Sequence, residues 1–248
     1  MRNCCKLLLI AALMVVACKP KQDISVIAHP VHVDSFMQSK LETELNDFRK
    51  RKNEYFKTDQ ESPLPSQLKA VFNGLEYYPP NWSYRFEGPV IRYSDPTKFQ
   101  MITTSGVWRD AIKFGYIRFA MNGKEFKLEV YRLLDMEEKN LLFVPFIDAN
   151  VGKETYSAGR YIDLVEKSDG NYVIDFNTAY NPSCAYGGDF PCPVTPKENH
   201  LPIAIPAGEK ILPIAAALEQ GKKNLTQRRG EAEMNLVFLC DSAPLRLS

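Results

Sequence analysis

The chain has 248 residues, of which 45% are hydrophobic and 25% are charged, and its formal net charge is +1 at pH 7. A length of this order suits one domain with a sizeable hydrophobic core. The near-neutral charge argues against a nucleic-acid-binding protein, so we expect no nucleic-acid partner.

The N-terminal segment has the pattern of an export signal that ends at Cys18. Basic residues come first, an apolar run over residues 7–16 is too short to span a bilayer, and Ala17 stands just before the cysteine. Residues 15–18, Val-Val-Ala-Cys, resemble the bacterial lipoprotein signal, in which the cysteine is lipidated and becomes the new N-terminus. We therefore expect residues 1–17 to be a signal peptide. The alternatives are an ordinary cleaved signal peptide and a buried apolar helix.

A lipidated Cys18 would make the chain a membrane-anchored lipoprotein of the cell envelope, with its domain outside the cytoplasm. The lipid chains would be its contact with the membrane, and stable anchoring takes two or more of them. Lys19 stands where an aspartate can signal retention in the inner membrane, which favours the outer membrane. Residues 18–33 hold scattered polar residues and prolines and are predicted to be a tether.

Residues 35–57 are predicted to form an amphipathic helix, which we expect to pack on the rest of the domain. Ser35 and Gln38 fit a capping box at its start. The basic run 49–52 is interpreted as a solvated face, and a short second helix is expected over residues 67–72. The apolar positions of the first helix recur every three or four residues: Met37, Leu41, Leu45 and Phe48.

Short strands are predicted to follow the helices. Residues 117–121 and 126–130 alternate apolar and polar side chains on either side of Asn-Gly at residues 122–123. Asn-Gly between alternating segments is the strongest short signal for a β-hairpin. Weaker strand patterns precede it at residues 84–93 and 99–103.

A second hairpin is predicted from residues 161–166 and 172–176, because turn residues separate two alternating segments. Residues 141–146 are apolar enough for a central strand, although Pro145 puts them near a sheet edge or a strand end. The predicted fold class is therefore α+β and mostly β. We expect the N-terminal amphipathic helix to pack on an antiparallel β-barrel or sandwich-like domain.

Three cysteines follow the predicted tether, and an exported protein can oxidise them. Cys184 and Cys192 are the natural disulfide pair, with a loop rich in glycine and proline between them. Closing so short a loop would contribute roughly 2.5 kcal/mol on the chain-entropy model. Cys240 is left over.

Several segments are similar to the DUF1684 family of domains, which has no assigned activity. The resemblance covers about residues 47–210. We assign residues 34–210 to one DUF1684-like domain and residues 211–248 to a C-terminal extension. The segments that carry the resemblance are Ser62-Pro63-Leu64, Gly74–Pro79, Leu142–Asp148, Glu154–Leu164, Asp175–Tyr186, Cys192-Pro193 and Glu198–Pro202.

The resemblance implies that the polar residues of these segments and the two cysteines belong to one site or one buried framework. The candidate site residues are Arg160, Asp175, Asn177, Tyr180, Asn181, Glu198 and Asn199.

Three interpretations of these residues are open. In the architectural one, Arg160 pairs with Asp163, Asp175 or Glu198, and asparagine side chains fix the loop backbone. In the second, the residues form a ligand pocket or a hydrolytic site. Asp175 or Glu198 would then act as a general base, with Arg160 holding an anionic group.

The third interpretation is a metal site built from Cys184, Cys192 and His200. The cysteine spacing is not C-x-x-C, and an exported compartment favours oxidised cysteines. We therefore expect no metal and no cofactor. The predicted function is a non-catalytic ligand-binding or structural module, and the catalytic residues of any activity are unknown. The alternative is a hydrolase-like enzyme that acts on a small polar or anionic substrate.

Overall fold

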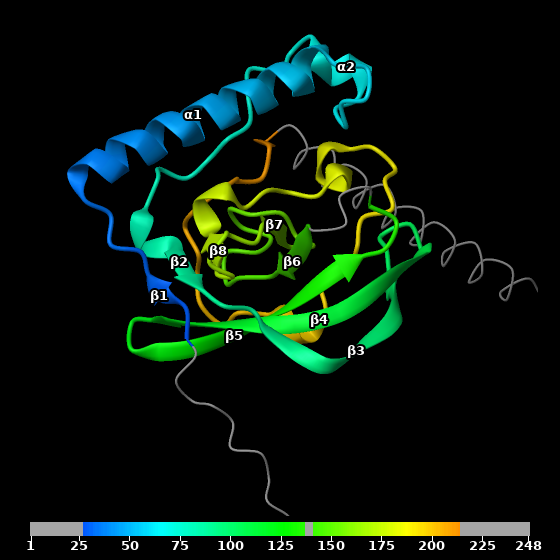
Figure 1. Cartoon of the computed structure of the whole chain (residues 1–248). Coiled ribbons are helices and arrows are strands. Elements are labelled where there is room, and N and C mark those ends of the chain that lie inside the picture. The colour runs from blue at the N-terminus through cyan, green and yellow to red at the C-terminus, as the bar shows by residue number, and fades with distance from the viewer. Residues whose placement is uncertain (1–26, 137–140, 214–248) are drawn as a thin grey trace, which may run out of the picture.

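The computed structural model describes residues 27–136 and 141–213, which Figure 1 shows in colour. The predicted signal peptide, Cys18 and Cys240 lie outside the described residues, as do most of the predicted tether and C-terminal extension. Ala28, inside the predicted tether, is buried and donates its backbone N–H to the carbonyl of Arg118 at 2.7 Å. The chain is therefore attached to the domain from this residue onward.

Two antiparallel sheets form most of the described fold, with strand orders β3-β4-β5-β6-β7 and β1-β2-β8. The mostly β, α+β class is confirmed. The predicted barrel is wrong for the described residues, because neither sheet pairs its first strand with its last. The strands are β1 (His29–Pro30), β2 (Arg85–Gly88), β3 (Ile91–Ile102), β4 (Trp108–Met121), β5 (Lys124–Leu133), β6 (Leu142–Phe146), β7 (Arg160–Leu164) and β8 (Tyr172–Asp175).

Strands β4 and β5 form the hairpin predicted around the Asn-Gly pair, which confirms that prediction. Met121 pairs with Lys124, so the loop has two residues. These residues, Asn122 and Gly123, have φ angles of 50° and 73°. A type I′ turn needs such a left-handed pair, and its twist matches the twist of the flanking strands.

The second predicted hairpin forms its turn but not its strand pairing. The backbone N–H of Lys167 donates to the carbonyl of Asn171 at 2.8 Å, and Glu166 forms a bridge with Tyr172. Beyond the turn, β7 pairs with β6 in the large sheet, whereas β8 pairs with β2 in the small one. Sheet membership depends on distant partners, which a local pattern does not contain.

Helix α1 spans Ser35–Thr58, and in Figure 1 it crosses the top of the domain with the sheets below it. Its N-cap is Asp34, whose side chain accepts the N–H of Met37 at 2.8 Å, so the predicted capping box at Ser35 is wrong by one residue. The first turn does not bury its apolar side chain, because Phe36 is 81% exposed.

The remaining helices are short. The second helix is confirmed but shorter than predicted, since α2 spans Ser66–Lys69. None of the helices within residues 27–136 and 141–213 is long and apolar enough to cross a membrane. Four 3-10 helices complete the described elements: η1 (Trp82–Tyr84), η2 (Phe176–Thr178), η3 (Ser183–Tyr186) and η4 (Lys197–Asn199).

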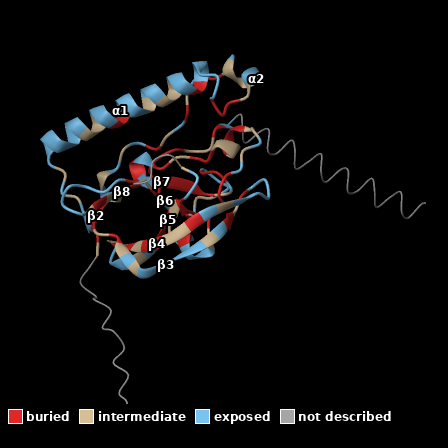
Figure 2. Ribbon diagram, turned by 45° about the vertical axis from the view of Figure 1, so that its right-hand side comes forward, coloured by how far each residue is buried: buried red, intermediate tan, exposed pale blue. Residues whose placement is uncertain are grey.

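The core lies between the two sheets. Phe86 of β2 and Ile174 of β8 join Phe119 of β4, Val144 of β6 and Ile162 of β7 in one buried cluster. Figure 2 shows buried residues concentrated in the strands, while α1 is mostly exposed or intermediate. A second, smaller cluster holds the C-terminal part of α1 to the domain, with its residues Phe56, Phe72 and Tyr186 in aromatic contact.

Candidate functional site

Arg160 begins β7 and is completely buried. Its guanidinium donates to the backbone carbonyls of Ile205 at 2.9 Å, of Ala207, and of Glu209 at 3.3 Å. The carboxylate of Asp148 lies 3.4 Å away. Burial lowers the pKa of Arg160, and the negative charge of Asp148 opposes that shift. Arg160 therefore binds a passing backbone segment and is not open to a substrate.

The acidic partner of Arg160 differs from the three that the sequence suggested. Asp148 also accepts the backbone N–H of Ile205 at 2.8 Å. The Arg160–Asp148 pair therefore binds both the N–H and the carbonyl of Ile205. The three suggested acids each have another partner: Asp163 with Tyr180, Asp175 with Arg85, and Glu198 with Lys113.

Asp175 ends β8 and lies beside Arg85 of the neighbouring strand, with which it forms an ion pair. Its Oδ1 accepts both the backbone and the side-chain N–H of Asn177 at 2.9 Å. The Asn177 side chain accepts the N–H of Asn81 at 2.8 Å and donates to its carbonyl at 3.0 Å. Together these residues hold the aromatic loop around Asn81 against the end of β8.

Tyr180 extends the large sheet at its β7 edge. Its backbone exchanges two hydrogen bonds with Tyr161, at 2.8 Å and 3.0 Å. Its hydroxyl donates to Asp163 at 2.9 Å. Burial raises the pKa of Tyr180 well above its ordinary value, so the hydroxyl stays protonated and acts as a donor.

Asn181 belongs to a buried polar cluster around Glu209, a residue that the sequence did not single out. Its Nδ2 donates to the carbonyl of Lys210 at 2.8 Å and to the Glu209 carboxylate at 3.3 Å. That carboxylate is fully buried, and it also accepts from Tyr186 and from Lys52 of α1, the latter at 2.7 Å. Helix and C-terminal segment thus meet at one carboxylate.

Glu198 and Asn199 are adjacent in η4 but differ in environment, because Glu198 is partly exposed and Asn199 is buried. The carboxylate of Glu198 accepts from Lys113 at 3.1 Å and from Tyr131 at 3.4 Å. A hydrogen bond from its own backbone N–H lowers the pKa of Glu198, and Lys113 adds to that shift while burial opposes it.

The side chain of Asn199 completes the sheet between β5 and β6. These antiparallel strands pair at Tyr131 and Phe143. In the same register Glu129 would pair with Pro145, but proline has no backbone N–H to donate. The buried Asn199 amide accepts the N–H of Glu129 at 2.7 Å and donates to its carbonyl at 2.9 Å. It also donates to the carbonyl of Pro145 at 2.7 Å. An asparagine side chain therefore replaces the missing backbone donor.

Cys184 and Cys192 are neighbours, and both are free thiols in this structure. The disulfide between them stays a prediction. The backbone N–H of Cys184 donates to Sγ of Cys192 at 3.2 Å, and the Tyr156 hydroxyl lies 3.6 Å from Sγ of Cys184. A hydrogen bond from Cys192 lowers the pKa of the Cys184 thiol to about 6, whereas the same contact raises the pKa of Cys192.

A cavity of about 300 Å³ lies beside this pair, and we call it the cysteine pocket. The loop that joins the cysteines contributes Phe190 and Pro191 to its wall. The guanidinium of Arg109 at its rim is fixed by two hydrogen bonds to Asp135, at 2.7 Å and 2.8 Å. Its lining includes Arg109, Tyr161, Tyr180, Ser183, Phe190 and Cys192.

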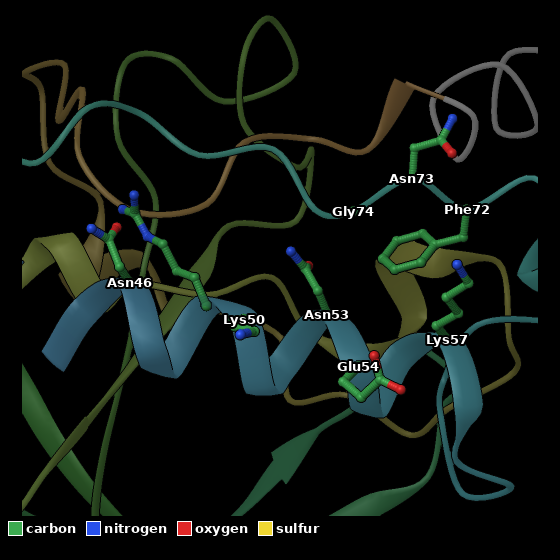
Figure 3. A pocket seen from close by; sticks show the side chains of 9 residues that line it. Asn46, Lys50, Asn53, Glu54, Lys57, Phe72, Asn73 and Gly74 are labelled. Atoms are coloured by element: carbon green, nitrogen blue, oxygen red, sulfur yellow. The ribbon is translucent and has the colours of Figure 1, made fainter. Parts of the chain in front are cut away.

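A second cavity, of about 470 Å³, lies between α1 and residues 72–74, and we call it the helix pocket. Figure 3 shows Asn53 rising from α1 toward this segment, with Lys57 beside Phe72. Three cations and one carboxylate line it: Arg49, Lys50, Lys57 and Glu54. The lining is therefore net positive.

The third interpretation of the candidate residues is a metal site, and the structure gives it no set of metal-binding side chains in the part of the chain that it describes. Among the described residues, no group of three His, Cys, Asp or Glu side chains could hold a metal ion. The backbone of His200 instead forms a bridge with Ile147 beside the large sheet.

The structure brings only some of the sequence-predicted residues together. Arg160 and Asn181 meet at Glu209, and Asp175 is hydrogen-bonded to Asn177. Glu198 and Asn199 have polar neighbours outside both groups. Sequence reasoning missed four residues with structural roles: Lys52, Glu129, Asp148 and Glu209. Charged side chains of this kind are usually exposed, so a sequence does not mark them as buried. Only Asp148 lay in a segment that carries the family resemblance.

A family model described as a protein of unknown function, DUF1684, matches residues 70–210. The chain belongs to the DUF1684 family. This confirms the resemblance over the part of the chain that holds every candidate site residue. Every contact described above for Arg160, Asn181 and Asn199 joins residues of the matched range.

The chain is also similar to a solved structure. The chain is similar to an uncharacterized protein of Haloarcula marismortui whose solution NMR structure is known, with 34% sequence identity and a TM-score of 0.55. The match covers 70% of this chain and 95% of that chain. No curated protein matches the chain.

Proposed function

We propose that the chain is a lipid-anchored protein of the cell envelope whose DUF1684 domain binds a small anionic molecule without catalysing a reaction. The buried state of Arg160 supports a non-catalytic role. Its guanidinium is already bonded to three carbonyls and to Asp148, so a hydrolase substrate would have to displace part of the fold.

The observation that carries the proposal is the charge of the helix pocket. Arg49, Lys50 and Lys57 line, together with one carboxylate, Glu54, a cavity large enough for a small molecule. Cations converging on a concave surface raise the local concentration of anions. A phosphate or carboxylate group is the chemistry that this lining would recognise.

The walls of the helix pocket are held in place by the fold. The guanidinium of Arg49 stacks 4.3 Å from the ring centroid of Tyr77 and donates to the carbonyl of Tyr78 at 3.3 Å. Its Nε has no hydrogen-bond partner among the described residues. Across the cavity, the Asn53 side chain accepts the N–H of Leu75 at 2.9 Å. A ligand would meet a preformed site, which reduces the entropic cost of binding.

The anchor rests on the sequence pattern at Cys18. Ala28, where the chain joins the domain, lies ten positions after that cysteine. Even fully extended, this stretch reaches at most roughly 35 Å. Lipidation at Cys18 would therefore keep the domain close to the membrane surface.

Inorganic phosphate is the first probe of the helix pocket. We expect it to stabilise the purified domain by RT ln(1 + c/Kd), where c is the phosphate concentration, so the melting temperature should rise with c. The double variant Lys50→Gln, Lys57→Gln should lose most of that increase. A control with the same charge change outside the pocket, Lys40→Gln with Lys124→Gln, should keep it.

Two results would contradict this ligand site. Equal phosphate effects on the wild type and both double variants would show only a general salt effect. Hydrolysis of a phosphate or carboxylate ester that is abolished by Glu198→Gln, with an unchanged melting temperature, would replace the binding role with an enzymatic one.

The anchor has its own test. In the native host, the wild type should incorporate labelled palmitate and sediment with the outer-membrane fraction. The Cys18→Ala variant should do neither. Palmitate on the variant, or an unlabelled wild type, would reject lipidation at this cysteine.

A further inference from the structure

The two cysteines of the domain are held as a reactive pair. Backbone hydrogen bonds link Cys192 to Thr104 in both directions, at 2.9 Å from the Thr104 N–H and at 3.3 Å to its hydroxyl. Cys184 lies in η3 and points its backbone N–H at Sγ of Cys192. Cys192 is thus fixed by the distant residue Thr104, and the backbone of Cys184, eight residues before Cys192, lies against its sulfur.

The two thiols are chemically unequal. A hydrogen bond from Cys192 lowers the pKa of the Cys184 thiol, and the hydroxyl of Tyr156 lies 3.6 Å from its Sγ. Donors to sulfur stabilise its thiolate, and the thiolate is the nucleophile in thiol chemistry. Cys184 is half-buried and Cys192 is buried. The more acidic thiol is thus also the more accessible one.

The cysteine pocket provides room for a reaction partner. Ser183, directly before Cys184, and Cys192 itself both line the cavity of about 300 Å³. Tyr161 and Tyr180 supply apolar faces, and Arg109 supplies a cation at the rim. This combination suits a small disulfide with apolar stems and carboxylate ends.

We propose that Cys184 and Cys192 form a redox-active dithiol that exchanges with a low-molecular-weight disulfide bound in the cysteine pocket. This goes beyond a static disulfide, because it makes the bond reversible and gives each sulfur a different role. It uses a cavity other than the helix pocket and so does not depend on the proposed function.

The exchange balances in two steps. The Cys184 thiolate attacks one sulfur of the small disulfide, whose S–S bond breaks, and the released thiolate takes up a proton. The Cys192 thiol then loses its proton and attacks Sγ of Cys184, which expels the second small thiol. The small disulfide is reduced to two thiols, and the protein dithiol is oxidised to the Cys184–Cys192 disulfide.

The resolving step is supported by the backbone N–H of Cys184. It already points at Sγ of Cys192, so it would stabilise negative charge on that sulfur as its proton leaves. Cys184 is the attacking residue and Cys192 the resolving one.

Oxidised glutathione is the probe, and the reduced mature chain with Cys18→Ser and Cys240→Ser is the background, so that two thiols remain. Oxidised glutathione should convert this protein to a form two hydrogens lighter. With Cys192→Ser added, mass spectrometry should find one glutathione on Cys184. With Cys184→Ser added instead, modification should be at least about tenfold slower, because the remaining thiol is buried and protonated.

A second measurement needs no variant at either cysteine. The rate of alkylation of Cys184 by iodoacetamide, followed by peptide mapping, should reach half its maximum near pH 6. Alkylation of Cys192 should be slow throughout that range. This readout remains valid even where a serine variant fails to fold.

Three results would overturn the proposal. Equal reactivity of the two cysteines would remove the assigned roles. Failure of the folded wild type to react with oxidised glutathione would show a closed pocket. A Cys184–Cys192 disulfide that a large excess of reduced glutathione cannot open would make the pair a permanent structural crosslink.

Discussion

The ammonium of Lys52 lies 2.7 Å from the carboxylate of Glu209, a residue 157 positions later in the sequence. This contact joins the C-terminal half of α1 to the last described segment of the domain. Tyr186 and Asn181 donate to the same carboxylate. The buried charge of Glu209 is therefore matched by three donors from two separate regions of the chain, α1 and residues 181–186.

Lys52→Met should destabilise the domain by about 3–5 kcal/mol, because it leaves the buried carboxylate of Glu209 without its cation. Urea denaturation would measure the loss. The double variant Lys52→Met, Glu209→Gln should recover part of it. As a control, Lys40→Met breaks an exposed pair with Glu44 and should cost less than about 1 kcal/mol. A small effect of Lys52→Met would contradict the buried pair.

Asn199→Ala should destabilise the domain by several kcal/mol, at about 1–3 kcal/mol for each buried group left unsatisfied. The variant removes three hydrogen bonds to Glu129 and Pro145. A fall in melting temperature would check this. Glu198→Ala, one residue earlier and partly exposed, is the matched control with a smaller expected effect. Similar melting temperatures for the two variants would show that the amide does not join the strands.

Asp175→Asn tests framework against catalysis at one residue. If Asp175 has a structural role, the variant weakens its contacts to Arg85 and Asn177, and we expect the free energy of unfolding to fall by about 1.5–3 kcal/mol. Asn81 should become more mobile with it, visible as faster amide exchange. An unchanged stability combined with loss of an enzymatic turnover would support the hydrolase alternative instead.

Acid should weaken the domain partly through Glu198 and Asp135. A backbone hydrogen bond lowers the pKa of Glu198, and the hydrogen bonds of Arg109 lower that of Asp135, so each carboxyl binds a proton less readily when folded. The stabilisation is full above the ordinary values of 4.5 and 3.8 and is lost as the pH falls through the folded ones. Since both groups are partly exposed, each contributes about 1 kcal/mol or less.

Denaturant titrations at pH 6 and pH 3 would measure this difference. Glu198→Gln and Asp135→Asn should each reduce the loss of stability between the two pH values. An acid dependence identical to that of the wild type would show that these carboxyls do not contribute.

Features fixed by neighbouring residues were predictable from the sequence. The Asn-Gly turn predicted the β4–β5 hairpin because two left-handed residues in a row nearly dictate the turn type. The helix was predicted from its apolar spacing, yet its cap was misplaced, since Asp34 and Ser35 both suit that position. The pairing of β8 with β2 was missed because their partners are about 90 positions apart.

The sequence predicted which residues belong to the candidate site better than it predicted what each residue does. The family resemblance named Asn199, but its role appears only when Pro145, 54 positions earlier, lies beside it. Asp148 and Glu209 carry buried charge that a linear pattern does not distinguish from surface charge. Burial depends on which distant segments meet, so these roles required the structure.

The acceptors of Arg160 come late in the chain. Its guanidinium is satisfied by carbonyls 45 to 49 positions further on, within residues 205–209. Until that segment has emerged from the ribosome or an export channel, the N-terminal portion has a cation that it cannot bury. A nascent chain cut before residue 205 should therefore remain protease-sensitive. Folding of this domain would begin only when nearly all of it has been delivered.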